Sequence, residues 1–123
     1  MKSYKELDIY NLSFHYAIEV HKLSLKLPKF ELYEQGSQIR RSSKSIKDNI
    51  VEGYGRRKYK NEFVKFLIYS YSSLLECLSQ LEMLSELYPE LAFETMIKKY
   101  DELGAKLYSF TNYVENNWLT NKK

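Results

Sequence analysis

The sequence contains little cysteine, proline or glycine. Its 123 residues include one Cys, two Pro and four Gly. The lone Cys77 excludes an internal disulfide, which is typical of proteins from a reducing compartment. Few Pro and Gly residues mean few tight turns, and this argues against a β-sandwich or a β-barrel.

Long hydrophobic runs are absent as well. No apolar stretch approaches the ~20 residues that span a bilayer, and residues 1–8 lack the apolar core of a signal peptide. We therefore expect a cytoplasmic protein with no membrane association. The chain is nevertheless 44% hydrophobic and 28% charged, as folded proteins are. Its length suits a single domain over residues 1–123.

Apolar residues recur at spacings of three and four in four segments, and this periodicity predicts four helices. Their approximate ranges are 8–27, 33–52, 61–88 and 90–118. Pro28 is expected to end the first helix, Asn61 to cap the third and Pro89 to open the fourth. Because short links make neighbouring helices antiparallel, we predict an all-α, up-down antiparallel four-helix bundle.

Two of these segments carry informative stripes. In the first, Phe14, Ile18 and Leu25 widen the apolar face. In the second, small and branched residues form a seam where helix backbones can approach closely; they are Gly36, Ile39, Ser43, Ile46 and Ile50. A basic stripe repeats the same spacing one position further on and consists of Arg40, Lys44 and Lys47.

Positive charge is concentrated in one part of the chain. Residues 40–66 carry nine Lys and Arg against three acids, whereas residues 67–121 carry three Lys against eight acids. Such a basic segment attracts polyanions. A solvated helix face with no binding function explains the same charges about equally well. The candidate phosphate contacts are Arg40, Arg41, Lys44, Lys47, Arg56, Arg57, Lys58 and Lys60. Tyr54 and Tyr59 lie among them and are candidates for stacking on unpaired bases.

The Gly53-Tyr54-Gly55 segment does not match a phosphate-binding loop. Neither a Walker A pattern nor a dinucleotide fingerprint is present, and no strand precedes it. We interpret Gly53 as the left-handed residue that ends the second helix, with Gly55 as a second permissive point. Asn49 and Glu52 share a helix face and are expected to hold this corner structurally.

No pattern indicates a metal site, a cofactor or catalysis. His15 and Glu19 can share a helix face, but His21 points elsewhere, and the Glu-x-x-His pairs of a di-metal bundle are missing. Cys77 falls on an apolar stripe without a histidine partner, which favours a core position. Glu52 has no evident acid–base partner. We expect a non-enzymatic protein without metal or cofactor.

Residues 38–56, QIRRSSKSIKDNIVEGYGR, resemble the signature Q-x-R-R-x-x-x-S-I-x-x-N-I-x-E-G-x-G-R. This signature belongs to the four-helix-bundle proteins encoded in intervening sequences of bacterial 23S rRNA genes, which are often labelled ribosomal-protein-like. Residues 63–67 and 73–76 resemble its continuation. The resemblance implies a closed homo-oligomeric ring, typically a pentamer, with basic surfaces suited to RNA or DNA. Related bundles are accessory proteins of diversity-generating retroelements, beside a reverse transcriptase.

Two hypotheses follow. The first is a non-enzymatic protein that binds nucleic acid, with structured RNA related to 23S rRNA as the first candidate ligand and the basic corner as the contact. The second is a protein-interaction scaffold, for instance an accessory subunit of a reverse transcriptase. In that case the tyrosines and the acidic fourth helix matter as much as the basic corner.

Overall fold

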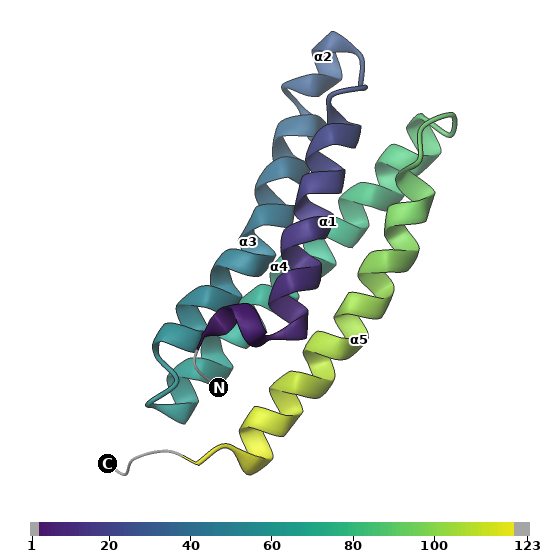
Figure 1. The fold of residues 1–123 in the computed structure, drawn as a ribbon. Coiled ribbons are helices and arrows are strands. Elements are labelled where there is room, and N and C mark those ends of the chain that lie inside the picture. Colours follow the sequence, from purple (N-terminus) through teal and green to yellow (C-terminus); the bar gives the residue numbers. More distant parts are fainter. Residues whose placement is uncertain (1–2, 120–123) are drawn as a thin grey trace.

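All regular structure in the computed structural model, which describes residues 3–119, is helical. A 3₁₀ turn, η1, is followed by five α-helices: η1 (Tyr4–Glu6), α1 (Asp8–Ser24), α2 (Lys29–Leu32), α3 (Gln35–Gly55), α4 (Lys60–Leu87) and α5 (Phe93–Asn117). The four long helices, α1, α3, α4 and α5, pack along one another (Figure 1). The predicted all-α, four-helix architecture is confirmed.

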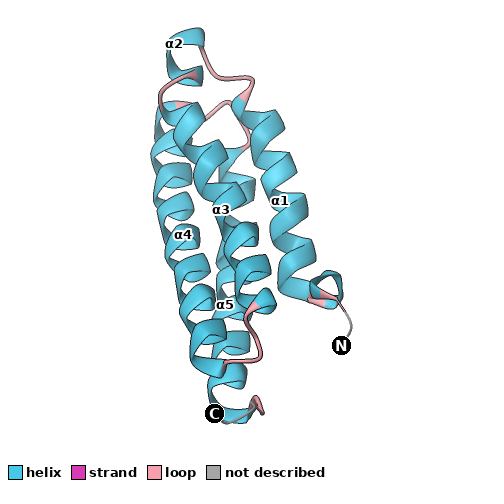
Figure 2. Cartoon of the chain, turned by 90° about the vertical axis from the view of Figure 1, so that its left-hand side faces the viewer, coloured by secondary structure: helices cyan, strands magenta, loops and turns pink. Residues whose placement is uncertain are grey.

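Each long helix packs against two others. Helix α3 contacts α1 and α4, and α5 closes the arrangement by contacting α4 and α1. Figure 2 shows α1, α3 and α4 side by side along one flank. The links are short enough that successive long helices run in opposite directions, so their apolar faces enclose one core.

The apolar seams predicted from the sequence line this core. In α3, Ile39, Ile46 and Ile50 have no exposed surface. Facing residues of α4 and α5 are equally buried; they include Phe63, Leu67, Leu74, Leu81, Leu103 and Leu107. Full burial of one such side chain contributes roughly 1.5–3 kcal/mol, which makes this seam the main source of stability.

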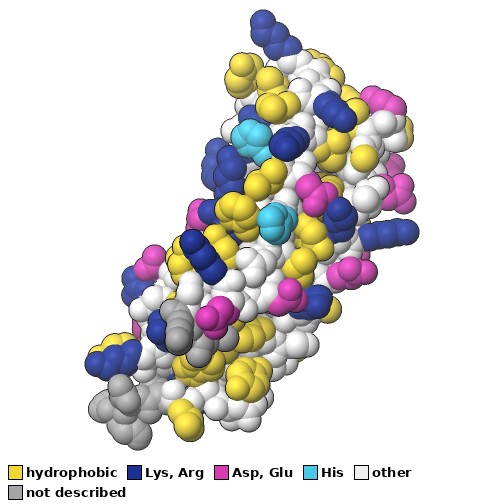
Figure 3. Space-filling model, viewed as in Figure 1, with side chains coloured by type: hydrophobic (Ala, Val, Ile, Leu, Met, Phe, Trp, Pro, Cys, Tyr) yellow, Lys and Arg dark blue, Asp and Glu magenta, His cyan; other side chains and the backbone are white. Residues whose placement is uncertain are grey.

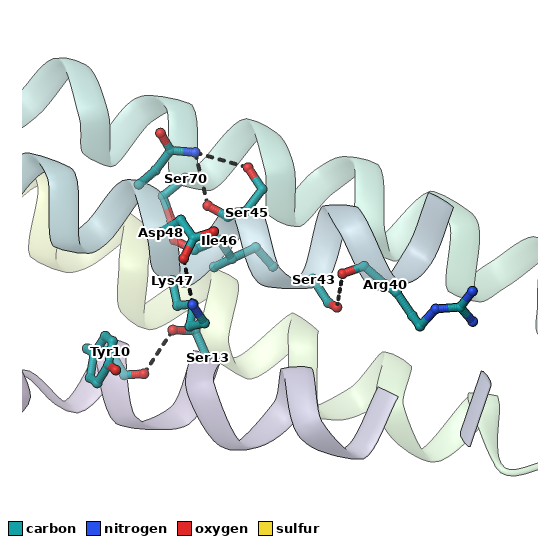
Figure 4. Close-up of polar contacts among 10 residues, drawn as sticks. Tyr10, Ser13, Arg40, Ser43, Ser45, Ile46, Lys47, Asp48 and Ser70 are labelled. Carbon is teal, nitrogen blue, oxygen red and sulfur yellow. Dashed lines mark hydrogen bonds and ion pairs between the residues drawn. The ribbon is translucent and has the colours of Figure 1, made fainter. Parts of the chain in front are cut away.

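Serine side chains let α3 and α4 approach closely and then bond across the contact. The Ser70 hydroxyl on α4 donates to the Ile46 carbonyl at 2.7 Å (Figure 4). The Ser42 hydroxyl on α3 donates to the Gln80 side-chain oxygen at 2.6 Å. Because these hydroxyls have partners, their burial carries no penalty for an unpaired polar group.

Several predicted helix ends are displaced. The first helix ends at Ser24, not at residue 27, and Pro28 then caps an extra helical turn, α2. The cap expected at Asn61 is wrong, because α4 already begins at Lys60 and Tyr59 precedes it without a side-chain cap. Pro89 lies in the turn before α5 and does not open that helix.

The expectation that Gly53 ends its helix is also wrong. Helix α3 continues through Gly53 to Gly55 and is capped by Arg56, whose φ of −104° is not left-handed. Gly53 instead allows α4 to come close. A Cβ at this position would lie 3.1 Å from the Phe66 Cβ and 3.3 Å from the Phe63 carbonyl oxygen. Glycine is required here by packing and not by backbone conformation.

Tyr100 and Cys77 meet in the middle of the core. Both are fully buried, as expected for Cys77, and burial raises the pKa of the Cys77 thiol to about 12. The thiol therefore stays protonated and unreactive. Burial, with the neighbouring Cys77 as a second cause, also raises the pKa of Tyr100. Within residues 3–119 the Tyr100 hydroxyl has no hydrogen-bond partner.

Removing that hydroxyl is expected to stabilise the protein. Tyr100→Phe should raise the free energy of unfolding by about 1 kcal/mol, because an unpaired buried polar group costs roughly this amount. Urea denaturation measures the change, and Tyr108→Phe serves as the control because Tyr108 is exposed. A loss of stability in Tyr100→Phe would mean that the Tyr100 hydroxyl donates a stabilising hydrogen bond to the Cys77 sulfur.

Candidate nucleic-acid interface

The candidate cations are distributed along the whole of α3 and do not gather at one corner. A rise of 1.5 Å per residue separates Arg40 from Arg56 by roughly 24 Å along the helix axis. Arg40 lies beside α2, whereas Arg56, Arg57, Lys58 and Lys60 lie at the opposite end, where α3 turns into α4. The structure therefore separates the candidates into two groups, one around Arg40 and the other where α3 turns into α4.

Arg56 ties the two helices of the corner together. Its guanidinium donates to Glu52 at 2.9 Å and to Glu62 at 3.0 Å, and it lies 4.6 Å from the centre of the Phe66 ring. The hydrogen bond to Glu52, above all, raises the pKa of Arg56. Glu52 thus pairs with Arg56 at the end of α3, and Arg56 makes the link to α4 through Glu62.

Asn49 was expected to help hold the same corner, but it acts one turn earlier. Its side-chain amide donates to the Ser45 carbonyl at 3.0 Å and to the Ser45 hydroxyl at 3.1 Å. Both bonds stay within α3, so Asn49 stiffens the helix and does not cross to the corner.

Arg57 and Tyr54 form a second packed pair at the corner. The Arg57 guanidinium lies 3.9 Å from the centre of the Tyr54 ring and donates to the Tyr54 carbonyl at 3.0 Å. The Trp118 indole donates to the Arg57 carbonyl at 3.2 Å. Tyr54 is only 6% exposed, so its ring is not open to a nucleic-acid base. Tyr59, at 54% exposed, keeps an accessible ring.

Arg40 and Lys60 satisfy carbonyl and hydroxyl groups at helix ends. Arg40 donates to the Ser24 hydroxyl at 2.8 Å and to the Leu32 carbonyl at 2.9 Å. Lys60 donates to the Glu115 carbonyl near the end of α5 at 3.1 Å. The last carbonyls of a helix lack partners within that helix. Both cations therefore have structural roles, while their charges still add to the local field.

Arg41 and Lys44 are exposed cations with no ion pair in the described part of the chain. Lys58 is exposed at the corner, with its ammonium 5.7 Å from the Tyr59 ring centre. Lys47 is half-buried and pairs with Asp48 (Figure 4). Among these candidates, Arg41 and Lys44 have no ion pair within residues 3–119, whereas the charge of Lys47 is already paired.

A groove between α1 and α3 adds residues that sequence reasoning missed. Helix α1 contributes Phe14, Ala17, Ile18, His21 and Lys22, and α3 contributes Lys44 and Lys47. The groove measures about 370 Å³. Phe14 and Ile18 are 38% and 40% exposed. In the sequence these two residues widen the apolar face of the first helix, and that excess width is the signal that α1 has an apolar surface outside the core.

Three lysines, Lys22, Lys44 and Lys47, line the groove. Figure 3 shows Lys and Arg side chains beside hydrophobic ones at the upper left, where α3 and α1 lie in Figure 1. Partial burial, followed by the charges of Lys44 and Arg40, lowers the pKa of His21. Burial is the larger cause, and the two cations add to it because an imidazole near positive charge resists taking up a proton.

Within residues 3–119 no group of three or more His, Cys, Asp or Glu side chains is arranged to hold a metal ion. In the same range, no helix combines the length and the apolar character needed to cross a bilayer.

Fold and surface together define a class: a small antiparallel four-helix bundle with a cationic flank along α3. No curated protein matches the chain significantly. The family model of the 23S rRNA-intervening sequence proteins, however, matches residues 5–109. That range includes α1, α2, α3, α4 and most of α5. The chain therefore belongs to the 23S rRNA-intervening sequence protein family.

Proposed function

We propose that this protein is a non-enzymatic nucleic-acid-binding protein whose ligand is structured RNA related to 23S rRNA. One observation carries the proposal: residues 40–66, which lie along α3 and its corner, contain nine cations and only three acids. Phosphate groups bind such surfaces through Lys and Arg. The family name, which refers to 23S rRNA, supports RNA as the first ligand to test.

In this proposal the cations have two different roles. Arg41, Lys44 and Lys58 are exposed and contact phosphates directly. Arg40, Arg56, Arg57 and Lys60 hold helix ends and the corner through the hydrogen bonds described above, and contribute mainly through their field. Tyr59 is the ring available for stacking at the corner.

Salt dependence tests this proposal. The double variant Arg41→Ala/Lys58→Ala should bind 23S rRNA fragments more weakly. Each lost phosphate contact should also reduce the slope of log affinity against log salt by about 0.7–0.9. Lys29→Ala/Lys98→Ala removes the same charge from exposed positions outside the surface and should change the slope little. If the two double variants behave alike, α3 and the corner are not the contact.

A second candidate function is a protein-interaction scaffold, such as an accessory subunit of a reverse transcriptase, built on a homo-oligomeric ring. Two separate apolar patches favour it. One lies on α4 and α5 and includes Ile68, Leu75 and Tyr108; the other, near α2, includes Leu25, Phe30 and Tyr33, and all six side chains are exposed. Contacts between two different patches are head-to-tail and can close into rings, including the pentamer implied by the resemblance.

Two measurements distinguish this second function from the first: the mass of the assembled protein, and the effect of nuclease on any partner that co-purifies with it. Light scattering of the purified protein should give a single multiple of the chain mass if the patches assemble it. A reverse transcriptase that co-purifies after nuclease treatment is a protein partner. One that is lost on nuclease treatment is bridged by nucleic acid.

A further inference from the structure

A line of aromatic rings connects the α3–α4 corner to the α1–α3 groove. The Tyr54 ring centre lies 6.3 Å from that of Tyr4, which lies 4.8 Å from that of Tyr10. Tyr10 is then 5.9 Å from Phe14. The line begins in the buried corner and ends at Phe14, where a ring is partly open to solvent at the groove.

Cations from both helices line the same groove as this ring. Lys22 projects from α1 and Lys44 and Lys47 from α3, all of them lining the same groove as Phe14. Asp48 neutralises part of the charge of Lys47. A positively charged groove with an aromatic platform is the combination by which proteins hold unpaired nucleic-acid strands.

Resting on the proposed function, we infer that the α1–α3 groove binds an unpaired segment of nucleic acid, with a base stacked on Phe14 and phosphates on Lys22, Lys44 and Lys47. A regular duplex keeps its bases paired and stacked, so it would leave the apolar part of the groove unused. A strand with exposed bases uses both the ring and the lysines.

An acidic peptide is the competing occupant, and the charge distribution disfavours it. The cations extend from the groove in both directions along α3, to Arg41 on one side and, past Asp48 and Glu52, to Lys58 at the corner on the other. A continuous polyanion neutralises charge along that whole length, whereas a short peptide in the groove uses only one part of it.

Binding of oligouridine strands, compared with a duplex of the same charge, tests the groove. Phe14→Ala should weaken strand binding roughly tenfold, the effect of losing one stacked base, and leave duplex binding unchanged. Lys22→Ala/Lys44→Ala should reduce the salt slope for the strand by about 1.4, which corresponds to two phosphate contacts. Tyr69→Ala is the matched control, because Tyr69 is an exposed ring on α4.

The unmodified protein provides an independent measurement. A phosphate seated beside Lys44 offsets the charges that help to lower the pKa of His21, so added oligouridine should raise the His21 pKa followed by NMR. An unchanged His21 titration at saturating strand would overturn the assignment of the groove. A glutamate-rich peptide that displaces the strand from the groove at lower concentration would overturn it in favour of a protein ligand.

The failures of the two proposals are distinguishable. If rRNA binding depends on Arg41 and Lys58 but not on Phe14 or Lys22, the inference about the groove fails and the proposed function stands. If neither strand nor rRNA fragment binds the unmodified protein at low salt, both fail together.

Discussion

Gly53→Ala is expected to destabilise the protein by about 1–3 kcal/mol, the usual cost of overpacking a tight contact. Alanine ordinarily stabilises a helix relative to glycine by up to ~1 kcal/mol. At Gly53, however, the added Cβ would lie 3.1–3.3 Å from the Phe66 Cβ, the Phe63 ring and the Phe63 carbonyl oxygen. A Cβ and a backbone oxygen cannot rotate away, so α4 itself must move.

Gly55→Ala is the matched control for this experiment. It lies at the end of the same helix, and no heavy atom lies within 4 Å of the position its Cβ would take. The gain in helix propensity should therefore appear undiminished, at up to about 1 kcal/mol. Urea unfolding of both variants measures the difference. Gly53→Ala as stable as Gly55→Ala would show that α3 and α4 do not need this close approach.

These two glycines show what the sequence can and cannot predict about the fold. Burial follows the helical period, so the spacing of Ile39, Ile46 and Ile50 correctly predicted the face of α3 that packs inward. The sequence places both Gly53 and Gly55 at the end of the helix and predicts a backbone role for each. Their roles differ because only Gly53 faces α4, and that distance depends on how two helices pack.

The candidate surface was predictable to a similar degree. The number of Lys and Arg residues in each segment predicted the basic segment, because this number can be read directly from the sequence. It could not show that Arg40 and Lys60 are bound to helix ends, because their acceptors, which include the Leu32 and Glu115 carbonyls, belong to other helices. The groove was missed because Phe14 and Lys22 lie on α1, outside the basic segment.

Phe63→Ala is expected to have the largest effect on stability, a loss of about 3–5 kcal/mol. Phe63 is fully buried where α3, α4 and α5 meet at the corner. Its ring centre lies 6.5 Å from that of Tyr54, 6.0 Å from Phe110 and 5.2 Å from Trp118. Truncation removes three aromatic contacts, each worth roughly 0.5–1.5 kcal/mol beyond the buried area, and leaves a cavity between stiff rings.

This loss is a large fraction of the roughly 5–15 kcal/mol that stabilises a typical domain. Urea unfolding measures it against Tyr69→Ala, which truncates an exposed ring on the same helix and should cost far less. Equal losses in the two variants would mean that the corner can collapse around the missing ring.

The same variant connects stability to the proposed function. Trp118 packs on Phe63 and donates a hydrogen bond to the Arg57 carbonyl, so removal of the Phe63 ring should loosen the backbone beside Lys58. We expect weaker binding of rRNA fragments by Phe63→Ala even where circular dichroism shows a folded protein. Undiminished binding would mean that the corner contributes charge without needing a fixed geometry, because long-range attraction to a polyanion tolerates displaced cations whereas specific phosphate contacts do not.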